Sequence, residues 1–397
     1  MLYSDFKGIK LSRLGFGAMR LPLLPDGKSI DGDEVQRMVD YAIGHGVNYF
    51  DTAYPYHGGY SEIVLGKALA KHPRESWYIS DKFPGHQHHL AETPEQVFEK
   101  QQKKCGVEYF DFYLLHNVCE NSLPSYLDPS KGYVEYFVEQ RRLGRIRHLG
   151  FSSHADLDAL KAFLDSPYGA QMEFCQIQLN YLDWTLQKAE QKCRMLGDYG
   201  IPVWVMEPLR GGLLSSLGDE ADAALKALRP DESVSAWGFR WLQSVPGVKM
   251  ILSGMSNLEQ MKDNVRTFES ERPLSEAEEA VLLDAVAPMR SRVPCTACRY
   301  CCDGCPMELD IPMLIAAYND LSLGFNFTPV MRLEALPEDK LPSACLACGA
   351  CAEICPQHIP IPDVLASLAE KYDSMPKWSD ICRQRAEEAA RLNANKD

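Results

Sequence analysis

The residues with the clearest chemical signature are eight cysteines in two short runs in the last third of the chain. Each run has the spacing Cys-x2-Cys-x2-Cys-x3-Cys-Pro, and the second run repeats the first with an offset of 50 residues. This spacing lets three thiolates of one tight loop reach three irons of a cubane cluster, while the fourth ligand comes from elsewhere. The sequence therefore predicts two [4Fe-4S] clusters.

The pattern also indicates how the two runs share their ligands. In two-cluster ferredoxins the fourth cysteine of each run serves the other cluster. We therefore assign one cluster to Cys295, Cys298, Cys301 and Cys355, and the other to Cys345, Cys348, Cys351 and Cys305. Two structural zinc sites are the alternative. We disfavour them because zinc ribbons use paired Cys-x2-Cys knuckles and need neither a third cysteine nor the Cys-Pro step.

A second set of reactive residue types follows short apolar runs in the first third of the chain. It comprises a carboxylate, a phenol, an ammonium group and an imidazole: Asp51, Tyr56, Lys82 and His116. A lysine beside a tyrosine favours the phenolate, which makes the phenol a better proton donor near neutral pH. Asp51 can hold Lys82 in place, and His116 can orient a substrate oxygen. These residue types predict a site for carbonyl reduction.

Three of the four residues have an ordinary explanation when each is taken alone. Asp51 could cap a loop, Lys82 could form a surface ion pair, and His116 could be a core histidine. All four, however, fall where a predicted strand ends. Barrel enzymes place their chemistry at the C-terminal ends of strands, so the joint placement favours an active site.

The segments that carry these residues belong to a pattern that repeats from Leu14 to about residue 267. Each repeat consists of an apolar run, a polar loop and a segment with helical spacing. We expect strands at Leu14–Phe16, Asn48–Asp51, Tyr78–Ser80, Phe112–Leu115, His148–Phe151, Phe174–Leu179, Val203–Met206 and Met250–Leu252. Expected helices cover 33–44, 61–70, 94–104, 133–143, 156–164, 186–198, 232–243 and 257–265, with caps at Asp31, Thr93 and Asn257.

Eight such units predict an α/β fold, a (β/α)8 TIM barrel of parallel strands with right-handed crossovers. An open doubly wound sheet is the alternative, which we disfavour because no Gly-x-Gly-x-x-Gly turn follows the first strand. The sequence pattern changes after about Pro288, where strand-like alternation stops and cysteines become more frequent. We therefore expect the barrel in residues 1–287 and a small, mainly α-helical, two-cluster ferredoxin-like domain in 288–397, with helices at 312–321, 362–371 and 377–392.

Composition narrows the classes of partner and compartment. The chain has 397 residues, with 41 Lys and Arg against 55 Asp and Glu, so its formal net charge is −14. This acidic balance argues against nucleic acid or an anionic membrane as a partner. No apolar run approaches a membrane span or a signal-peptide core, so we expect a cytoplasmic protein. Nine of the 14 cysteines lie within Cys295 to Cys355, which in such a chain points to metal rather than to disulfides.

Residues 1 to about 270 resemble the aldo-keto reductases. The Asp, Tyr, Lys and His tetrad of that family corresponds to Asp51, Tyr56, Lys82 and His116, and the whole chain resembles the branch with a C-terminal ferredoxin-type domain. The resemblance implies a small carbonyl substrate and NADP(H) or NAD(H) as coenzyme. It implies coenzyme contacts from Ser152, Ser153, Gln176, Met206, Pro208, Leu209, Gly211, Ser253, Gly254, Met255, Asn257, Gln260 and Asn264.

The chain departs from the family pattern at two places that bear on the coenzyme. Met206 stands where many members stack an aromatic ring on nicotinamide. Gly254 and Gln260 stand where NADP-specific members carry Lys and Arg for the 2′-phosphate, a group that normally needs charged donors. Lys262, Arg266 and Arg210 are the cations that could replace them.

Three histidines, His86, His88 and His89, lie in the loop after the third predicted strand. No carboxylate or cysteine set accompanies them. We therefore expect a solvated or substrate-facing loop rather than a metal site.

Taken together, these features predict an oxidoreductase that reduces an aldehyde or ketone and uses two [4Fe-4S] clusters for electron transfer, with a redox partner protein. The alternative is an electron-transfer protein whose barrel binds FMN or a redox partner and reduces carbonyls poorly. We include flavin because nicotinamide transfers two electrons as a hydride, whereas a cubane transfers one electron at a time. Flavin can do both.

Overall fold

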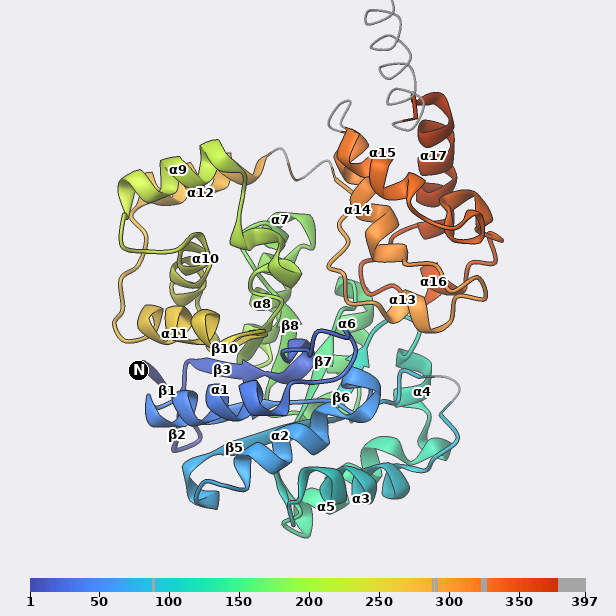
Figure 1. The fold of residues 1–397 in the computed structure, drawn as a ribbon. Helices are drawn as coiled ribbons and strands as arrows, with labels where there is room; N and C mark the ends of the chain where they lie inside the picture. Colours follow the sequence, from blue (N-terminus) through green and yellow to red (C-terminus); the bar gives the residue numbers. More distant parts are fainter. Residues whose placement is uncertain (88–89, 288, 290–291, 323–326, 378–397) are drawn as a thin grey trace, which may run out of the picture. The chain divides into compact units, whose positions relative to one another are not determined.

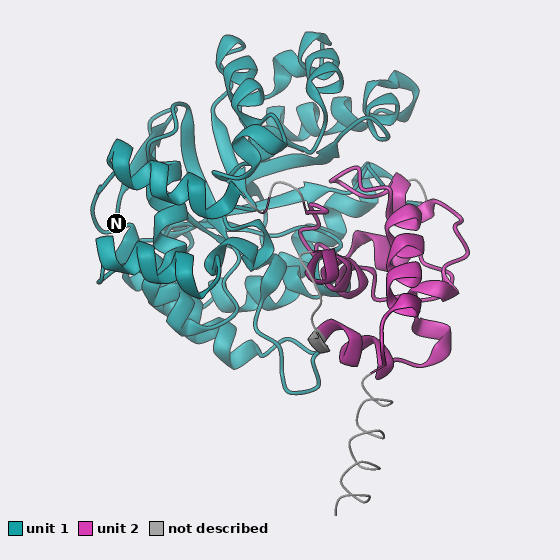
Figure 2. Ribbon diagram, turned by 90° about the horizontal axis from the view of Figure 1, so that it is seen from above, with its two compact units in different colours: residues 1–287 teal, residues 288–397 magenta. Residues whose placement is uncertain are grey.

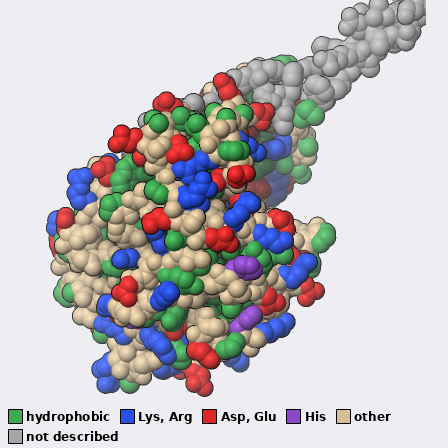
Figure 3. Space-filling model, turned by 90° about the vertical axis from the view of Figure 1, so that its left-hand side faces the viewer, with side chains coloured by type: hydrophobic (Ala, Val, Ile, Leu, Met, Phe, Trp, Pro, Cys, Tyr) green, Lys and Arg blue, Asp and Glu red, His purple; other side chains and the backbone are tan. Residues whose placement is uncertain are grey.

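The computed structural model describes residues 1–397 except 88–89, 288, 290–291, 323–326 and 378–397. The chain divides into two compact units, Met1–Ala287 and Pro288–Asp397 (Figure 2). Side chains of both charges are interspersed over the face shown in Figure 3. Among the described residues, no helix has the length and apolar character needed to cross a membrane.

Eight parallel strands of the first unit close into a barrel in the order β10-β3-β4-β5-β6-β7-β8-β9 (Figure 1). They are β3 (Leu14–Gly17), β4 (Tyr49–Asp51), β5 (Tyr78–Phe83), β6 (Phe110–Val118), β7 (Ile146–Ser153), β8 (Cys175–Gln178), β9 (Val203–Met206) and β10 (Val248–Ser253). The closed order confirms the predicted barrel over the open sheet. Several strands are longer than expected, so Lys82, His116 and Ser152 lie inside strands rather than beyond them.

Helices connect the strands and cover the outside of the barrel (Figure 1). The eight that match predicted segments are α1 (Gly32–Gly44), α2 (Ser61–Leu69), α3 (Pro94–Cys105), α5 (Tyr133–Arg142), α6 (Leu157–Asp165), α8 (Ala189–Asp198), α10 (Val234–Gln243) and α11 (Leu258–Thr267). Additional helices are α4 (Leu123–Leu127), α7 (Asp183–Leu186), α9 (Asp219–Leu228) and α12 (Glu276–Val286). The side chains of Asp31, Thr93 and Asn257 each accept a backbone N–H at a helix start, as predicted.

One predicted helix is interrupted. The segment 186–198 contains the end of α7 and all of α8, and the two helices are separated at Lys188, which has a left-handed φ of 52°. A lysine in this conformation cannot continue right-handed helical hydrogen bonding. The sequence predicted one continuous helix because the residues on both sides of the break have helical periodicity.

A hairpin that the sequence pattern did not reveal precedes the barrel. Its strands, β1 (Tyr3–Phe6) and β2 (Ile9–Ser12), are antiparallel. The buried ring of Phe6 lies 5.0 Å from the ring of Trp204 and 5.8 Å from that of Phe112, measured between centroids. Both partners lie near the start of their strands, so the hairpin packs at the N-terminal end of the barrel and leaves the opposite end to the loops.

The second unit is helical, with α13 (Tyr300–Asp303), α14 (Ile311–Ser322), α15 (Phe327–Glu334), α16 (Ala350–Glu353) and α17 (Ile361–Ser374). Predicted helices at 312–321 and 362–371 are confirmed as α14 and α17, while 378–392 of the third lies outside the described residues. The internal repeat extends to the backbone, because Ala297 and Ala347, 50 residues apart, have φ values of 53° and 51°. Each donates its N–H to a cysteine sulfur two residues earlier.

Candidate active site and cluster cavities

The four residues of the predicted tetrad meet at the C-terminal ends of neighbouring strands. Asp51 ends β4, Lys82 lies in β5, His116 lies in β6, and Tyr56 opens a short 3-10 segment, Tyr56–Gly59, after β4. Lys82 Nζ lies 5.1 Å from the centre of the Tyr56 ring, and the rings of Tyr56 and His116 meet edge to face with centroids 6.0 Å apart. The phenol therefore has the ammonium group on one side and the imidazole on another.

Lys82 is held by a buried ion pair. Its Nζ lies 2.5 Å from Asp51 Oδ1 and donates a second hydrogen bond to the carbonyl of Thr52 at 2.7 Å. Ser80 Oγ donates to the other oxygen of Asp51 at 3.0 Å. Burial raises the pKa of Asp51, and the charge of Lys82 opposes that rise. The two charges compensate each other away from water, which fixes the ammonium group beside Tyr56.

His116 is a neutral group at neutral pH. Burial lowers the pKa of its imidazole well below the ordinary value, and electrostatic interactions with His86, Lys82 and His154 lower it further. Its Nδ1 is buried and has no hydrogen-bond partner among the described residues. A neutral imidazole beside the phenol can orient a substrate oxygen without adding charge.

His86 departs from the expectation of a solvated loop. Its side chain is only 7% exposed, and its ring centroid lies 4.6 Å from that of His116. Its Nδ1 donates to the backbone carbonyl of His116 at 3.1 Å. His88 and His89 lie outside the described residues. Of the two expected positions, solvated or substrate-facing, burial excludes the solvated one for His86, because its side chain packs against His116 near the end of β6.

Two of the residues implied to contact nicotinamide are direct neighbours. Ser152 of β7 and Gln176 of β8 face each other in the strand register. Ser152 Oγ accepts the backbone N–H of Asn117 at 2.8 Å, and Ser153 Oγ donates to the carbonyl of Val118 at 2.8 Å. Gln176 Oε1 is buried with no hydrogen-bond partner in the described part of the chain. A buried acceptor that lacks a donor fits a ligand amide such as the carboxamide of nicotinamide.

The other implied coenzyme residues follow β9 and β10, which are neighbours in the barrel. Asn264 donates to Ser253 Oγ at 3.0 Å, Asn257 caps α11, and the side chain of Gln260 accepts the N–H of Ser256 at 2.8 Å. The remaining residues lie at the end of β9 or in the segments that follow β9 and β10: Met206, Pro208, Leu209, Gly211, Gly254 and Met255. The structure therefore gathers all of them on one side of the rim, and four of them, Ser253, Asn257, Gln260 and Asn264, form hydrogen bonds within the chain.

The cations suggested as replacements at the 2′-phosphate are already paired. Lys262 Nζ lies 2.8 Å from Glu259, and Arg266 lies 2.9 Å from Asp263. These are exposed pairs, which contribute little stability and can exchange partners. Arg210 is different, because it forms a buried ion pair with Asp183 at 3.0 Å.

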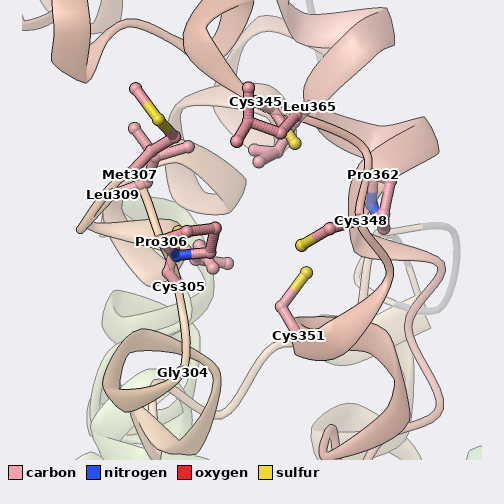
Figure 4. Close-up of a pocket in the computed structure, with 12 residues that line it drawn as sticks. Gly304, Cys305, Pro306, Met307, Leu309, Cys345, Cys348, Cys351, Pro362 and Leu365 are labelled. Carbon is pink, nitrogen blue, oxygen red and sulfur yellow. The ribbon is translucent and has the colours of Figure 1, made fainter.

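In the second unit, the cysteines of the two runs gather around two cavities. Cys345, Cys348 and Cys351 line a cavity of about 340 Å³, and the fourth cysteine in its wall is Cys305 from the other run (Figure 4). A second cavity of about 300 Å³ is lined by Cys295, Cys298 and Cys301, with Cys355 completing the set. Each cavity thus takes its fourth cysteine from the other run.

The walls of both cavities suit a cluster rather than a single ion. Apart from the thiols they are largely apolar, with Leu309 and Leu365 in the first and Ile315 and Ile359 in the second. Within the described residues, no three His, Cys, Asp or Glu side chains lie close enough together to hold one metal ion. A cubane binds four thiolates, each at a separate iron, and each cavity has four cysteines in its wall.

Comparison with known families gives two matches. The model described as "Aldo/keto reductase family" matches residues 13–285, and the model described as "4Fe-4S dicluster domain" matches residues 294–359. The first covers the barrel and the tetrad. The second covers both cysteine runs.

Individual relatives resemble the first unit. A methylglyoxal reductase of Escherichia coli (strain K12), named as NADH-specific, is 28% identical over 228 residues, and "Probable aldo-keto reductase 1" of Glycine max is 28% identical over 220 residues. These alignments cover 52% and 53% of this chain, and 66% and 60% of the relatives. The chain thus spans less than two-thirds of the length of either relative.

Solved structures share the barrel fold. The aldo-keto reductase AKR11C1 from Bacillus halodurans, in its holo form, has 24% identity and a TM-score of 0.56, covering 72% of this chain and 96% of that one. An aldo-keto reductase from Klebsiella pneumoniae in complex with NADPH has 19% identity and a TM-score of 0.57, covering 71% and 94%. At these identities the likeness concerns the fold.

Proposed function

Because the chain belongs to the aldo/keto reductase family and carries a 4Fe-4S dicluster domain, we propose that it reduces a small aldehyde or ketone with NADH or NADPH. Asp51, Tyr56, Lys82 and His116 are the proposed catalytic residues. The eight cysteines of the two runs are the proposed ligands of two [4Fe-4S] clusters, which exchange electrons with a redox partner protein.

One observation supports the proposal most directly: the ring of Tyr56 has both the buried ammonium group of Lys82 and the imidazole of His116 as neighbours. A bound nicotinamide would supply a hydride to the carbonyl carbon. Tyr56 gives its phenolic proton to the carbonyl oxygen, and the charge of Lys82 stabilises the phenolate that remains. Asp51 keeps Lys82 in position, and His116 orients the oxygen by hydrogen bonding. The neutral state of His116 adds no second positive charge beside that of Lys82.

The coenzyme assignment draws on Gln176 and Ser152. Their facing positions and the unpartnered Oε1 of Gln176 suit the carboxamide of nicotinamide. Both NADH and NADPH remain candidates, because Gly254 and Gln260 carry no charge for a 2′-phosphate, while Lys262 and Arg266 can leave their exposed partners. The relatives described above whose names mention a coenzyme mention NADH or NADPH, and none of those names mentions FMN.

The test is anaerobic turnover of the full, cluster-loaded chain. Loss of nicotinamide absorbance is followed with NADH or NADPH and a panel of small carbonyl compounds, beginning with methylglyoxal because one relative is named for it. Carbonyl-dependent oxidation of either coenzyme supports the proposal. If both coenzymes bind but no carbonyl in the panel is reduced, while purified protein contains flavin, the electron-transfer alternative replaces it.

A further inference from the structure

A carboxyl group without a complete set of partners stands at the rim between β9 and β10. Glu207 follows the last residue of β9, and its Oε2 is buried with no hydrogen-bond partner among the described residues. Its backbone has a left-handed φ of 55°, which is strained for a residue with a side chain. The backbone carbonyl oxygen of Glu207 accepts hydrogen bonds from Asn180 Nδ2 and from the backbone N–H of Arg210, both at 3.0 Å. The fold therefore holds the backbone of Glu207 in place, and one oxygen of its carboxyl group has no partner in the described part of the chain.

Three charged groups and one backbone N–H act on Glu207. Arg20, from the 3-10 segment after β3, exerts the strongest charge effect, ahead of Asp183 in α7 and Arg210 in the loop after β9. The attraction of Arg210 is offset by its own ion pair with Asp183. The backbone N–H of Gly211 also donates to the carboxyl group. Arg20 is thus the main counter-charge of Glu207.

Burial raises the pKa of Glu207 to about 7, against the opposing effects of Arg20, Arg210 and the Gly211 N–H. The carboxyl group is therefore divided between its neutral and ionised forms near neutral pH. A small change in nearby charge is enough to shift that balance.

The side chain of Arg20 also runs beside the loop after β10 at the same rim. A Cβ on Gly254, which follows β10, would stand 3.4 to 3.6 Å from the Cβ, Cγ and Cδ atoms of Arg20. The stem of Arg20 therefore lies across Gly254, in the segment that we propose contacts the coenzyme. Because β3, β10 and β9 are successive strands of the barrel, Arg20 can serve either Glu207 or a ligand at this rim.

We propose that Glu207 takes up one proton from solvent when the diphosphate of a nicotinamide coenzyme binds at this rim, as Arg20 transfers its charge from the carboxylate to the phosphates. The inference rests on the proposed function, since it needs a coenzyme at the rim. The added negative charge favours the neutral carboxylic acid. In that form the unused oxygen of Glu207 donates a hydrogen bond to a phosphate oxygen, whereas the ionised form would repel it. Binding and protonation are therefore linked.

The linkage has a definite sign. Binding should be strongest below about pH 7, where free Glu207 already holds its proton, and should weaken by up to about tenfold per pH unit above it. Proton uptake should approach about one per coenzyme near pH 8 and fall towards zero near pH 6.

The experiment is isothermal titration of the cluster-loaded full chain with NADH, in buffers of different ionisation enthalpy, which gives the number of protons taken up. Glu207→Gln should abolish the uptake and flatten the pH dependence of the dissociation constant. Glu269→Gln, which removes an exposed carboxylate near the end of α11, should change neither. Arg20→Gln removes the main counter-charge, so the free carboxyl group holds its proton to higher pH and the uptake near pH 8 should shrink.

The outcomes distinguish failure of the proposed function from failure of the role assigned to Glu207. If neither NADH nor NADPH binds the wild-type chain, the proposed function fails. If coenzyme binds without proton uptake, with proton release, or with uptake that survives in Glu207→Gln, the role of Glu207 is overturned while the proposed function stands. If Glu207→Gln does not fold, Arg20→Gln decides, because unchanged uptake in that variant also overturns the proposal.

Discussion

Lys82 and Asp51 form an ion pair between adjacent barrel strands, with both side chains buried and Lys82 Nζ 2.5 Å from Asp51 Oδ1. The pair has a structural consequence as well as a proposed catalytic one. Neither charge is hydrated, so each depends on the other for compensation. Removing one partner should therefore affect folding and turnover together.

Lys82→Met leaves the Asp51 carboxylate buried without its partner. We expect a loss of about 3–5 kcal/mol in the free energy of unfolding, measured by denaturant titration, together with loss of carbonyl reduction. Lys100→Met is the matched control, because Lys100 pairs with Glu92 at 3.0 Å on the surface and should cost about 0–1 kcal/mol. Equal costs in the two variants would contradict the buried pairing.

Tyr56→Phe removes the proposed proton donor and keeps the ring. We expect carbonyl reduction to fall by about 10²–10⁴-fold, because general acid catalysis supplies about that factor, while the dissociation constant of the coenzyme stays unchanged. Tyr54→Phe is the matched control, since the Tyr54 hydroxyl bonds to Glu92 and Lys100. Near wild-type turnover in Tyr56→Phe would exclude Tyr56 as the donor.

Gln176→Ala tests the coenzyme contact separately from the chemistry. Loss of a hydrogen bond to the nicotinamide carboxamide should weaken coenzyme binding by about 0.5–1.5 kcal/mol, or about 2- to 13-fold. Fluorescence titration of NADH and NADPH gives the dissociation constants. An unchanged affinity for both coenzymes would mean that the unpartnered oxygen of Gln176 faces something else.

The cysteines that line each cavity predict which cluster each cysteine substitution should perturb. Intact protein should contain about eight irons and eight sulfides per chain. Cys305→Ser should perturb the cluster in the cavity of Cys345, Cys348 and Cys351, as seen by electron paramagnetic resonance, and Cys355→Ser should perturb the other. Cys302→Ser, next to a proposed ligand but off the repeat, should leave both intact. Two zinc ions without acid-labile sulfide would overturn the cluster assignment.

Electron exchange between the coenzyme and the clusters is tested by anaerobic reduction. If the two are coupled, NADH or NADPH should bleach the broad cluster absorption, and added FMN should accelerate the bleaching because flavin bridges two-electron and one-electron steps. Dithionite is the positive control. Bleaching by dithionite alone, in protein that still reduces carbonyls, would show that the clusters do not draw electrons from the barrel coenzyme.

Much of the architecture is encoded in short-range sequence pattern. Eight apolar runs with intervening helical spacing identified the barrel strands, and the caps at Asp31, Thr93 and Asn257 marked helix starts. Such features are local, because periodicity and capping depend on residues a few positions apart. The sequence missed the β1–β2 hairpin and the break at Lys188, because neither carries a distinctive local pattern.

The residues able to do chemistry could be identified from the order of residues along the chain: the spacing of the cysteine runs identifies eight thiols, and a carboxylate, a phenol, an ammonium group and an imidazole follow successive strands. Which of these groups meet, and what surrounds them, depends on the tertiary fold. Strand register sets Ser152 opposite Gln176, and loop folding buries His86 against His116. The unpartnered oxygen of Glu207 likewise arises from packing of β9, β10 and the segment after β3. Burial and missing partners are properties of groups brought together across many residues, so no local pattern encodes them.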